Sequence, residues 1–241
     1  SDVMFVEDEI NGKFTVSYLL LPAMANKRIR TSNGYAPEIY NKFIVGADPF
    51  KFAKTMSRRK SNGGGAVFRL FDPEIDNVNK DVTEWQTNTT VCTYNCRVDD
   101  PTIYAEDMLM LCQYYNALIY PENNLDIIET HFINRGYAGY LKYDIDKLTG
   151  KMKQRAGRFS DEKTKQEMFS KIMAYIENHI CHEKHSELII EFKNIKSIDD
   201  MTNYDLFTAF GFCLLGIQQE IMKDDEDTNY DLSDILTIKY Y

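Results

Sequence analysis

The stretch Phe43-Ile44-Val45-Gly46-Ala47-Asp48-Pro49 decides the fold class of this sequence. Its first five residues form a short apolar run, which is typical of a central β-strand. Asp48-Pro49 predicts the end of that strand, because an Asp-Pro pair favours a turn. Gly46 leaves room for another segment to approach the backbone. The stretch therefore predicts a buried strand that carries an acidic residue at its carboxyl end.

Two further strands are predicted soon after the first. Residues 66–71 have a strand-like pattern, and residues 89–97 alternate enough to form a third strand. The segment 54–65, which contains Gly63-Gly64-Gly65, is expected to be a flexible turn between the first two strands. Three consecutive strands joined by turns predict an antiparallel meander.

Helices and strands then follow one another along the chain. Asp99-Asp100-Pro101 is typical of a helix start, since aspartate caps helices and proline suits the first turn. Ser160 is expected to cap a later amphipathic helix. The other expected elements are a helix at 103–115, a strand at 117–120, a helix at 125–134, strands at 137–143 and 188–192, and a helix at 202–222. This order predicts a mixed α/β fold rather than a doubly wound sheet.

Charged residues are unevenly distributed in the sequence. A formal net charge of −9, taken as one figure, argues against a nucleic-acid partner. However, residues 223–234 contain six acids against one lysine, so over half of the excess lies in one segment. Residues 51–60 contain five basic residues and no acid, and residues 147–165 contain seven basic residues against two acids. This distribution is compatible with an anionic partner.

We expect one large domain with an appendage at each end. Residues 1–40, with a strand-like run at 14–21, are expected to form a linker or an appended hairpin. Residues 41–222 are expected to form the α/β domain, and residues 223–241 are expected to form an acidic tail.

The five cysteines are odd in number and scattered, which is typical of a reducing compartment. No apolar run reaches the length of a membrane span, and the acidic N-terminus does not resemble a secretory signal. We therefore expect an intracellular protein without a membrane partner.

Three acidic residues, Asp48, Glu122 and Asp205, lie at the ends of predicted elements. Glu122 follows a strand apolar enough to be buried on both faces, and Asp205 opens a mostly apolar helix. Structural explanations exist for each: Asp48 can start a turn, Glu122 can accept from backbone amides, and Asp205 can belong to a capping box. Together, three carboxylates at neighbouring edges would repel one another unless a cation lies between them. Hard divalent cations prefer such oxygen ligands.

Three motifs, in their order along the chain, resemble those of the nuclease domain of the terminase large subunit of tailed phages. The stretch that ends in Asp48-Pro49 resembles the first acidic motif of that family. Residues 117–124, Ala117-Leu118-Ile119-Tyr120-Pro121-Glu122-Asn123-Asn124, resemble the second, and residues 203–210, Asn203-Tyr204-Asp205-Leu206-Phe207-Thr208-Ala209-Phe210, resemble the third. Phe159-Ser160 and Lys163-Thr164-Lys165 match the stretch before the family's long helix.

The resemblance implies an RNase H-like α/β fold, in which three antiparallel strands precede parallel strands and helices cover both faces of the mixed sheet. The strand that ends at Asp48 and the strand before Glu122 would be neighbours, with Asp205 arriving from a helix packed on the sheet. It also implies a Mg²⁺- or Mn²⁺-dependent endodeoxyribonuclease, in which Asp48, Glu122 and Asp205 are catalytic. They would hold two ions about 3.5–4 Å apart, with Asp48 bridging both.

Double-stranded DNA is the implied substrate, cut during phage genome packaging in the host cytoplasm. The implied partners are the terminase ATPase motor domain, the portal and the small terminase subunit. The sequence contains no G-x-x-x-x-G-K-[S/T] phosphate loop, so this chain does not include the motor.

Basic residues on both sides of the acidic centre are expected to bind DNA. A metal cluster cannot hold a duplex alone, because phosphates away from the scissile one still need counterions. A solvated surface with scattered lysines is the alternative explanation for these residues. The expected DNA-binding residues are Arg58, Arg59, Lys60, Lys151, Lys153, Arg155 and Arg158.

Other functions are compatible with parts of the sequence. A different RNase H-like nuclease, of the resolvase or transposase type, would use the same acids on another DNA substrate. A non-catalytic DNA-binding or docking module would keep the basic segments without cutting. His179, Cys181, His182 and His185 lie close together, but their spacing fits no paired zinc-finger pattern. They follow an amphipathic helix, where histidines suit the C-terminal dipole.

Overall fold

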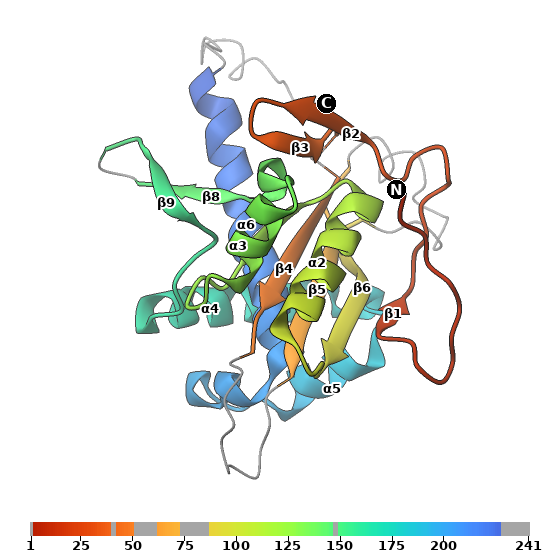
Figure 1. The fold of residues 1–241 in the computed structure, drawn as a ribbon. Helices are drawn as coiled ribbons and strands as arrows, with labels where there is room; N and C mark the ends of the chain where they lie inside the picture. The colour runs from red at the N-terminus through yellow and green to blue at the C-terminus, as the bar shows by residue number, and fades with distance from the viewer. Residues whose placement is uncertain (1, 40–41, 51–61, 73–86, 147–148, 228–241) are drawn as a thin grey trace, which may run out of the picture.

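The computed structural model describes residues 2–39, 42–50, 62–72, 87–146 and 149–227, with the backbone alone for residues 218–227 (Figure 1). Its centre is a five-stranded sheet in the order β1-β6-β5-β4-β7. The strands of this sheet are β1 (Phe14–Val16), β4 (Phe43–Asp48), β5 (Gly63–Arg69), β6 (Thr89–Cys96) and β7 (Leu118–Pro121).

The sheet is mixed, as expected. β4, β5 and β6 pair antiparallel in sequence order, so the predicted meander is confirmed. β7 lies on the other side of β4 and pairs parallel to it, with Val45 opposite Ile119. A parallel neighbour needs a crossover connection, which α2 (Pro101–Tyr115) supplies. The strands that lead to Asp48 and Glu122 are therefore adjacent, as the resemblance implied.

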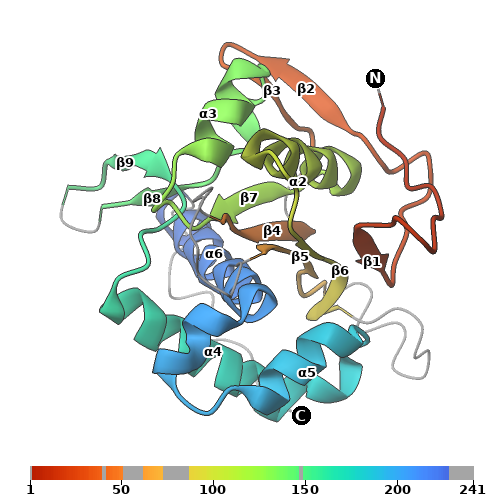
Figure 2. The ribbon, with the colours of Figure 1, turned by 60° about the horizontal axis from the view of Figure 1, so that its bottom comes forward.

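Helices cover both faces of the sheet, and Figure 2 shows the sheet between them. α2 packs on one face against Val45 and Ala47 of β4. α6 packs on the other face against Ile44, because successive side chains of a strand point to opposite faces. Outside the sheet the helices are α3 (Ile127–Asn134), α4 (Glu162–His179), α5 (Ser186–Asn194) and α6 (Asp205–Asp227), with short 3-10 segments η1 (Ala138–Tyr140), η2 (Ile180–His182) and η3 (Ile198–Asn203).

Gly63-Gly64-Gly65 lies in strand β5 and is buried, so the prediction of a flexible turn at these glycines was wrong. The three glycines allow close approach of a helix on each face of the strand. A Cβ on Gly64 would lie 2.2 Å from the carbonyl oxygen of Asp205 in α6. Cβ atoms on Gly63 and Gly65 would lie within 3 Å of Tyr104 and Met108 in α2. The glycine run thus leaves room for a helix to pack closely on each face of β5.

Three other sequence predictions were wrong in detail. Residues 188–192 belong to helix α5 rather than to a strand, and Leu188 and Phe192, four residues apart, are its buried residues. Residues 137–143 contain η1 and only begin strand β8 (Tyr143–Ile145), which pairs with β9 (Met152–Ala156) in a separate hairpin. Helix α4 is capped by Asp161, whose side chain accepts from the Thr164 amide, rather than by Ser160.

The ends of the chain only partly follow the expected division. β1 joins the main sheet through β6, whereas β2 (Arg28–Thr31) and β3 (Gly34–Pro37) form a hairpin of their own. Helix α6 continues to Asp227, past the expected start of the acidic tail at residue 223, and residues 228–241 lie outside the described part. The domain boundaries at 40 and 222 stay predictions.

Among the described helices, none has the length and apolar character to cross a bilayer.

Candidate active site

Asp48 and Glu122 meet at one edge of the sheet because β4 and β7 run parallel and end together. The Glu122 amide donates to the carbonyl oxygen of Ala47 at 2.8 Å, which extends the β4–β7 pairing to the acidic residues. Burial raises the pKa of Asp48 well above its ordinary value, and repulsion from Glu122 and Asp205 adds to this rise. The Asp48 carboxyl also lies within hydrogen-bonding reach of Glu122. Ionising both carboxyls costs free energy, because like charges this close repel each other.

Asp205 reaches the same place from helix α6. It is the first residue of that helix, and Gly64 allows its backbone to lie directly on β5. One of its side-chain oxygens, Oδ2, accepts from the Asn62 amide at 3.0 Å. The structure thus brings together all three acids that the sequence indicated, although they are far apart along the chain.

A fourth carboxylate, Glu191 of helix α5, lies beside these acids and was not predicted. Its Oε2 atom accepts from the Phe207 amide at 2.6 Å, so it binds the first turn of α6. Burial, together with repulsion from Asp205, raises the pKa of Glu191 to about 7. The hydrogen bond from the Phe207 amide opposes this rise and is included in that value. The spacing of Leu188 and Phe192, read as a helix, could have placed Glu191 on a defined face, but nothing local identifies Phe207 as its partner.

We expect Glu191→Gln to raise stability at pH 8 and to leave it unchanged near pH 4.5. A raised folded-state pKa means that Glu191 stabilises the fold below its ordinary pKa, and that this contribution is lost as pH rises through about 7. Glutamine keeps an acceptor for the Phe207 amide without the charge. Thermal melts from pH 4.5 to 8 in EDTA should show a gap that widens with pH, up to about 3 kcal/mol. A constant gap would contradict this account of Glu191.

The acids provide suitable donors for a divalent cation. Carboxylate oxygens are the ligands that Mg²⁺ and Mn²⁺ prefer, and the surplus negative charge here would be relieved by a cation as well as by protons. Within the described residues, no three His, Cys, Asp or Glu side chains are arranged to hold one metal ion. The Asp48 carboxyl instead pairs with Glu122. The chemistry of the donors therefore fits a cation, and binding one would require the Asp48 and Glu122 carboxyls to separate from each other.

The expected DNA-binding residues of the second basic segment lie on and around strand β9. Lys151 precedes the strand and is exposed. Lys153 and Arg155 are half-exposed, with ion pairs of 3.1 Å to Asp144 and 3.7 Å to Glu129.

Arg158 is less accessible, since its side chain is 19% exposed and pairs with both Asp144 and Glu167. Asp144 itself is buried and also accepts from the Tyr120 hydroxyl. Arg158 thus anchors the β8–β9 hairpin to the sheet and to α4. Arg58, Arg59 and Lys60 lie outside the described residues.

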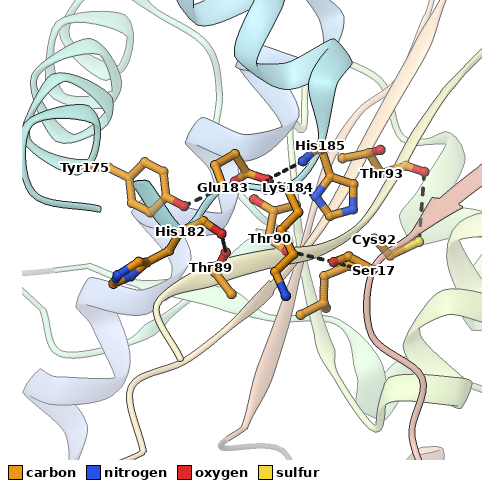
Figure 3. Close-up of polar contacts among 11 residues, drawn as sticks. Ser17, Thr89, Thr90, Cys92, Thr93, Tyr175, His182, Glu183, Lys184 and His185 are labelled. Carbon is orange, nitrogen blue, oxygen red and sulfur yellow. Dashed lines mark hydrogen bonds and ion pairs between the residues drawn. The ribbon is translucent and has the colours of Figure 1, made fainter. Parts of the chain in front are cut away.

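The histidine-rich stretch after α4 belongs to a polar cluster that contacts strand β6 (Figure 3). The Glu183 carboxylate accepts from the Tyr175 hydroxyl at 3.1 Å and lies 2.9 Å from Nδ1 of His185. Burial alone would raise the pKa of Glu183, but hydrogen bonds from the His185 ring and amide hold it below its ordinary value. Thr89 donates to the carbonyl oxygen of His182. These contacts fix the turn between α4 and α5 against the sheet.

The strand order, the parallel β4–β7 pair and the helices on both faces define an RNase H-like α/β domain with an acidic cluster at the strand ends. No protein-family model matches the sequence, and no curated protein matches it. Similar solved structures include two of the large terminase nuclease from thermophilic phage G20c. The one with bound zinc has a TM-score of 0.44 and the other 0.41. Each is 11% identical, and the match covers 79% of this chain and 91% of the other.

Proposed function

We propose that this chain is a metal-dependent endonuclease that cuts double-stranded DNA during phage genome packaging. The supporting observation is the gathering of Asp48, Glu122 and Asp205 at the carboxyl edge of two parallel strands, where burial and mutual repulsion raise the pKa of Asp48. Ligands bind at this edge in open α/β sheets. A structural role alone does not require three carboxylates to approach one another in a partly buried place.

In this proposal Asp48, Glu122 and Asp205 hold two Mg²⁺ or Mn²⁺ ions. When bound, such ions lower the pKa of a water molecule and neutralise charge on the leaving oxygen. The protein's own part is to position these ligands. β4 and β7 fix two of them through the sheet, and α6 fixes the third, held by the Asn62 amide and, through Phe207, by Glu191.

The proposed setting is the host cytoplasm, where the nuclease would act with a terminase ATPase motor, a portal and a small terminase subunit. These partners follow from the resemblance of the three acidic motifs.

The basic side chains of β9 would hold duplex phosphates beside the acids. The hairpin is suited to this because the Asn123 amide donates to the carbonyl oxygen of Arg158, directly beside Glu122.

Cleavage of a supercoiled plasmid tests the proposal. The chain should nick and linearise the plasmid with Mn²⁺ or Mg²⁺ and leave it intact in EDTA, with 5′-phosphate and 3′-hydroxyl ends on the products. Preferential cutting of a four-way junction over linear duplex would favour a resolvase-type nuclease instead. Tight duplex binding without cutting under any of these cations would favour a docking module and overturn the proposal.

We expect replacement of Lys151 and Arg155 by alanine to weaken binding of all duplex sequences alike. Each phosphate contact that is lost should flatten the slope of log affinity against log salt by about 0.9, so that the double variant should lose nearly two units. Fluorescence anisotropy with labelled duplex at several salt concentrations measures this. Lys165 and Lys171 of α4, replaced together, provide a control of equal charge. Equal slopes for the two double variants would place the DNA elsewhere.

A further inference from the structure

Asn124 forms two side-chain hydrogen bonds beside the acidic cluster. Its Nδ2 atom donates to Oε1 of Glu122 at 2.8 Å, and its Oδ1 atom accepts from the Ser160 amide at 3.1 Å. The Ser160 amide can only donate, so the carbonyl end of Asn124 must face it and the NH₂ end must face Glu122. The orientation of this amide is therefore fixed by its surroundings.

The segment around Ser160 is itself fixed to the end of strand β7. The Arg158 amide donates to the carbonyl oxygen of Pro121 at 3.1 Å, and the Asn123 amide donates to the carbonyl oxygen of Arg158 at 3.0 Å. A Cβ on Gly157 would lie 1.8 Å from the carbonyl oxygen of Pro121, and Gly157 has a φ of +70°. Only glycine allows this close approach with this backbone conformation. Through its two hydrogen bonds, Asn124 therefore connects the Glu122 carboxylate to the junction between the β8–β9 hairpin and α4.

A glutamate side chain that ends at a strand terminus has several rotatable bonds, and hydrogen bonds from neighbouring groups decide which way its carboxylate faces. An N–H donor leaves the other lone pairs of the carboxylate free, whereas a second acceptor in the same place would repel it. Groups that orient metal ligands in this way affect metal affinity or activity by about 10- to 100-fold.

We infer that Asn124 is a positioning residue for Glu122, which it orients toward Asp48 from the junction of the β8–β9 hairpin with α4. This inference rests on the proposed function. Asn124 does not itself touch the substrate. Its effect is transmitted through the Glu122 carboxylate, and it also connects that carboxylate to the hairpin that carries the basic residues of β9.

Direct Mn²⁺ binding tests this inference without relying on cleavage. We expect Asn124→Ala to weaken binding at least tenfold, measured by electron paramagnetic resonance of free Mn²⁺. Asn123→Ala is the matched control, because Asn123 contacts Arg158 through its backbone. In a Glu122→Gln background, Asn124→Ala should have no further effect on Mn²⁺ affinity, since the residue through which it acts has been changed.

Asn124→Asp separates positioning from a purely structural role. Aspartate keeps an acceptor for the Ser160 amide but loses the donor to Glu122. We expect the variant to fold, with a melting temperature below that of Asn123→Ala because its carboxylate faces Glu122, and its plasmid turnover at saturating Mn²⁺ to fall at least tenfold. This variant also covers the case in which Asn124→Ala fails to fold. Wild-type turnover in Asn124→Asp would show that Asn124 only ties Ser160 in place.

The outcomes distinguish this inference from the function on which it rests. If the wild-type chain binds Mn²⁺ and cuts, but Asn124→Ala binds Mn²⁺ as tightly as Asn123→Ala, the inference fails and the proposed function stands. An equal loss in the Glu122→Gln background also overturns the inference, because the effect then does not pass through Glu122. If the wild-type chain neither binds Mn²⁺ nor cuts, both fail.

Discussion

Asp48→Asn is expected to abolish cation-dependent plasmid cleavage without unfolding the protein. Asp48 is the acid whose pKa is raised by burial and by both Glu122 and Asp205, so it lies centrally among them. On the proposed function, asparagine removes a charged oxygen from a residue that would hold a divalent cation. Metal ions contribute several kcal/mol to such reactions, and each ~1.4 kcal/mol is a factor of ten, so the loss should be on the order of a thousandfold.

The thermal stability of Asp48→Asn should not fall with its cleavage activity. An acid with a raised folded-state pKa loses its favourable contribution as pH rises through that pKa, whereas a neutral amide at position 48 has no such loss. The variant should melt at the same or a higher temperature in EDTA. Asp126→Asn is a suitable control, since Asp126 is exposed and its side chain does not cap α3. Full cutting by Asp48→Asn together with a normal melt would remove Asp48 from the site.

Gly46→Ala is expected to destabilise the protein by about 3 kcal/mol or more, since it overpacks a close contact. A Cβ on Gly46 would lie 2.0 Å from the carbonyl oxygen of Ala209 and 2.6 Å from the amide nitrogen of Cys213. Both atoms belong to the backbone of α6, which must move as a whole. In a chain of this size the melting temperature should fall by about 6–12 °C. Asp205 moves with α6, so cleavage should fall as well.

Gly211→Ala is the matched control for this effect, because Gly211 lies on α6 and is also closely packed. Its added Cβ would meet the side chain of Met168, at 2.2 Å, rather than a backbone. Met168 can relieve this contact by changing its rotamer, without movement of a backbone, and alanine favours the helix by about 1 kcal/mol over glycine. We therefore expect a smaller change than for Gly46→Ala. Similar melting temperatures for Gly46→Ala and Gly211→Ala would mean that the backbone contact at Gly46 does not govern the position of α6.

The sequence allowed the elements with strong local signals to be predicted. β4 and β7 are short apolar runs ended by proline, and α2 begins at Asp100-Pro101, where the aspartate does accept from the Thr102 amide. The errors arose where local signals conflict with tertiary packing. Glycines 63–65 favour a turn, but two helices approach them so closely that only glycine fits in the strand. Residues 188–192 are a short apolar run, which cannot be assigned to helix or strand by periodicity alone.

The same limit applies to the candidate site. Asp48, Glu122 and Asp205 were indicated because each lies at the end of an element, a position visible in the sequence. Glu191 was missed because its importance depends on Phe207, which reaches it only after α5 and α6 pack together. Asn124 was part of a motif, but its contact with Ser160 depends on how the β8–β9 hairpin returns to β7. Partners of this kind are fixed by tertiary structure.

The parallel pairing of β4 with β7, and the later docking of α6, set the time during synthesis at which the site can form. Ribosomes make the chain from its N-terminus, so Asp48 emerges long before Asp205. Contacts between distant segments form late, because the intervening chain must first be ordered. A partly synthesised chain would lack the third acid and the helix that carries it. On the proposed function, an incomplete nuclease would therefore be unable to cut DNA while it is still being translated.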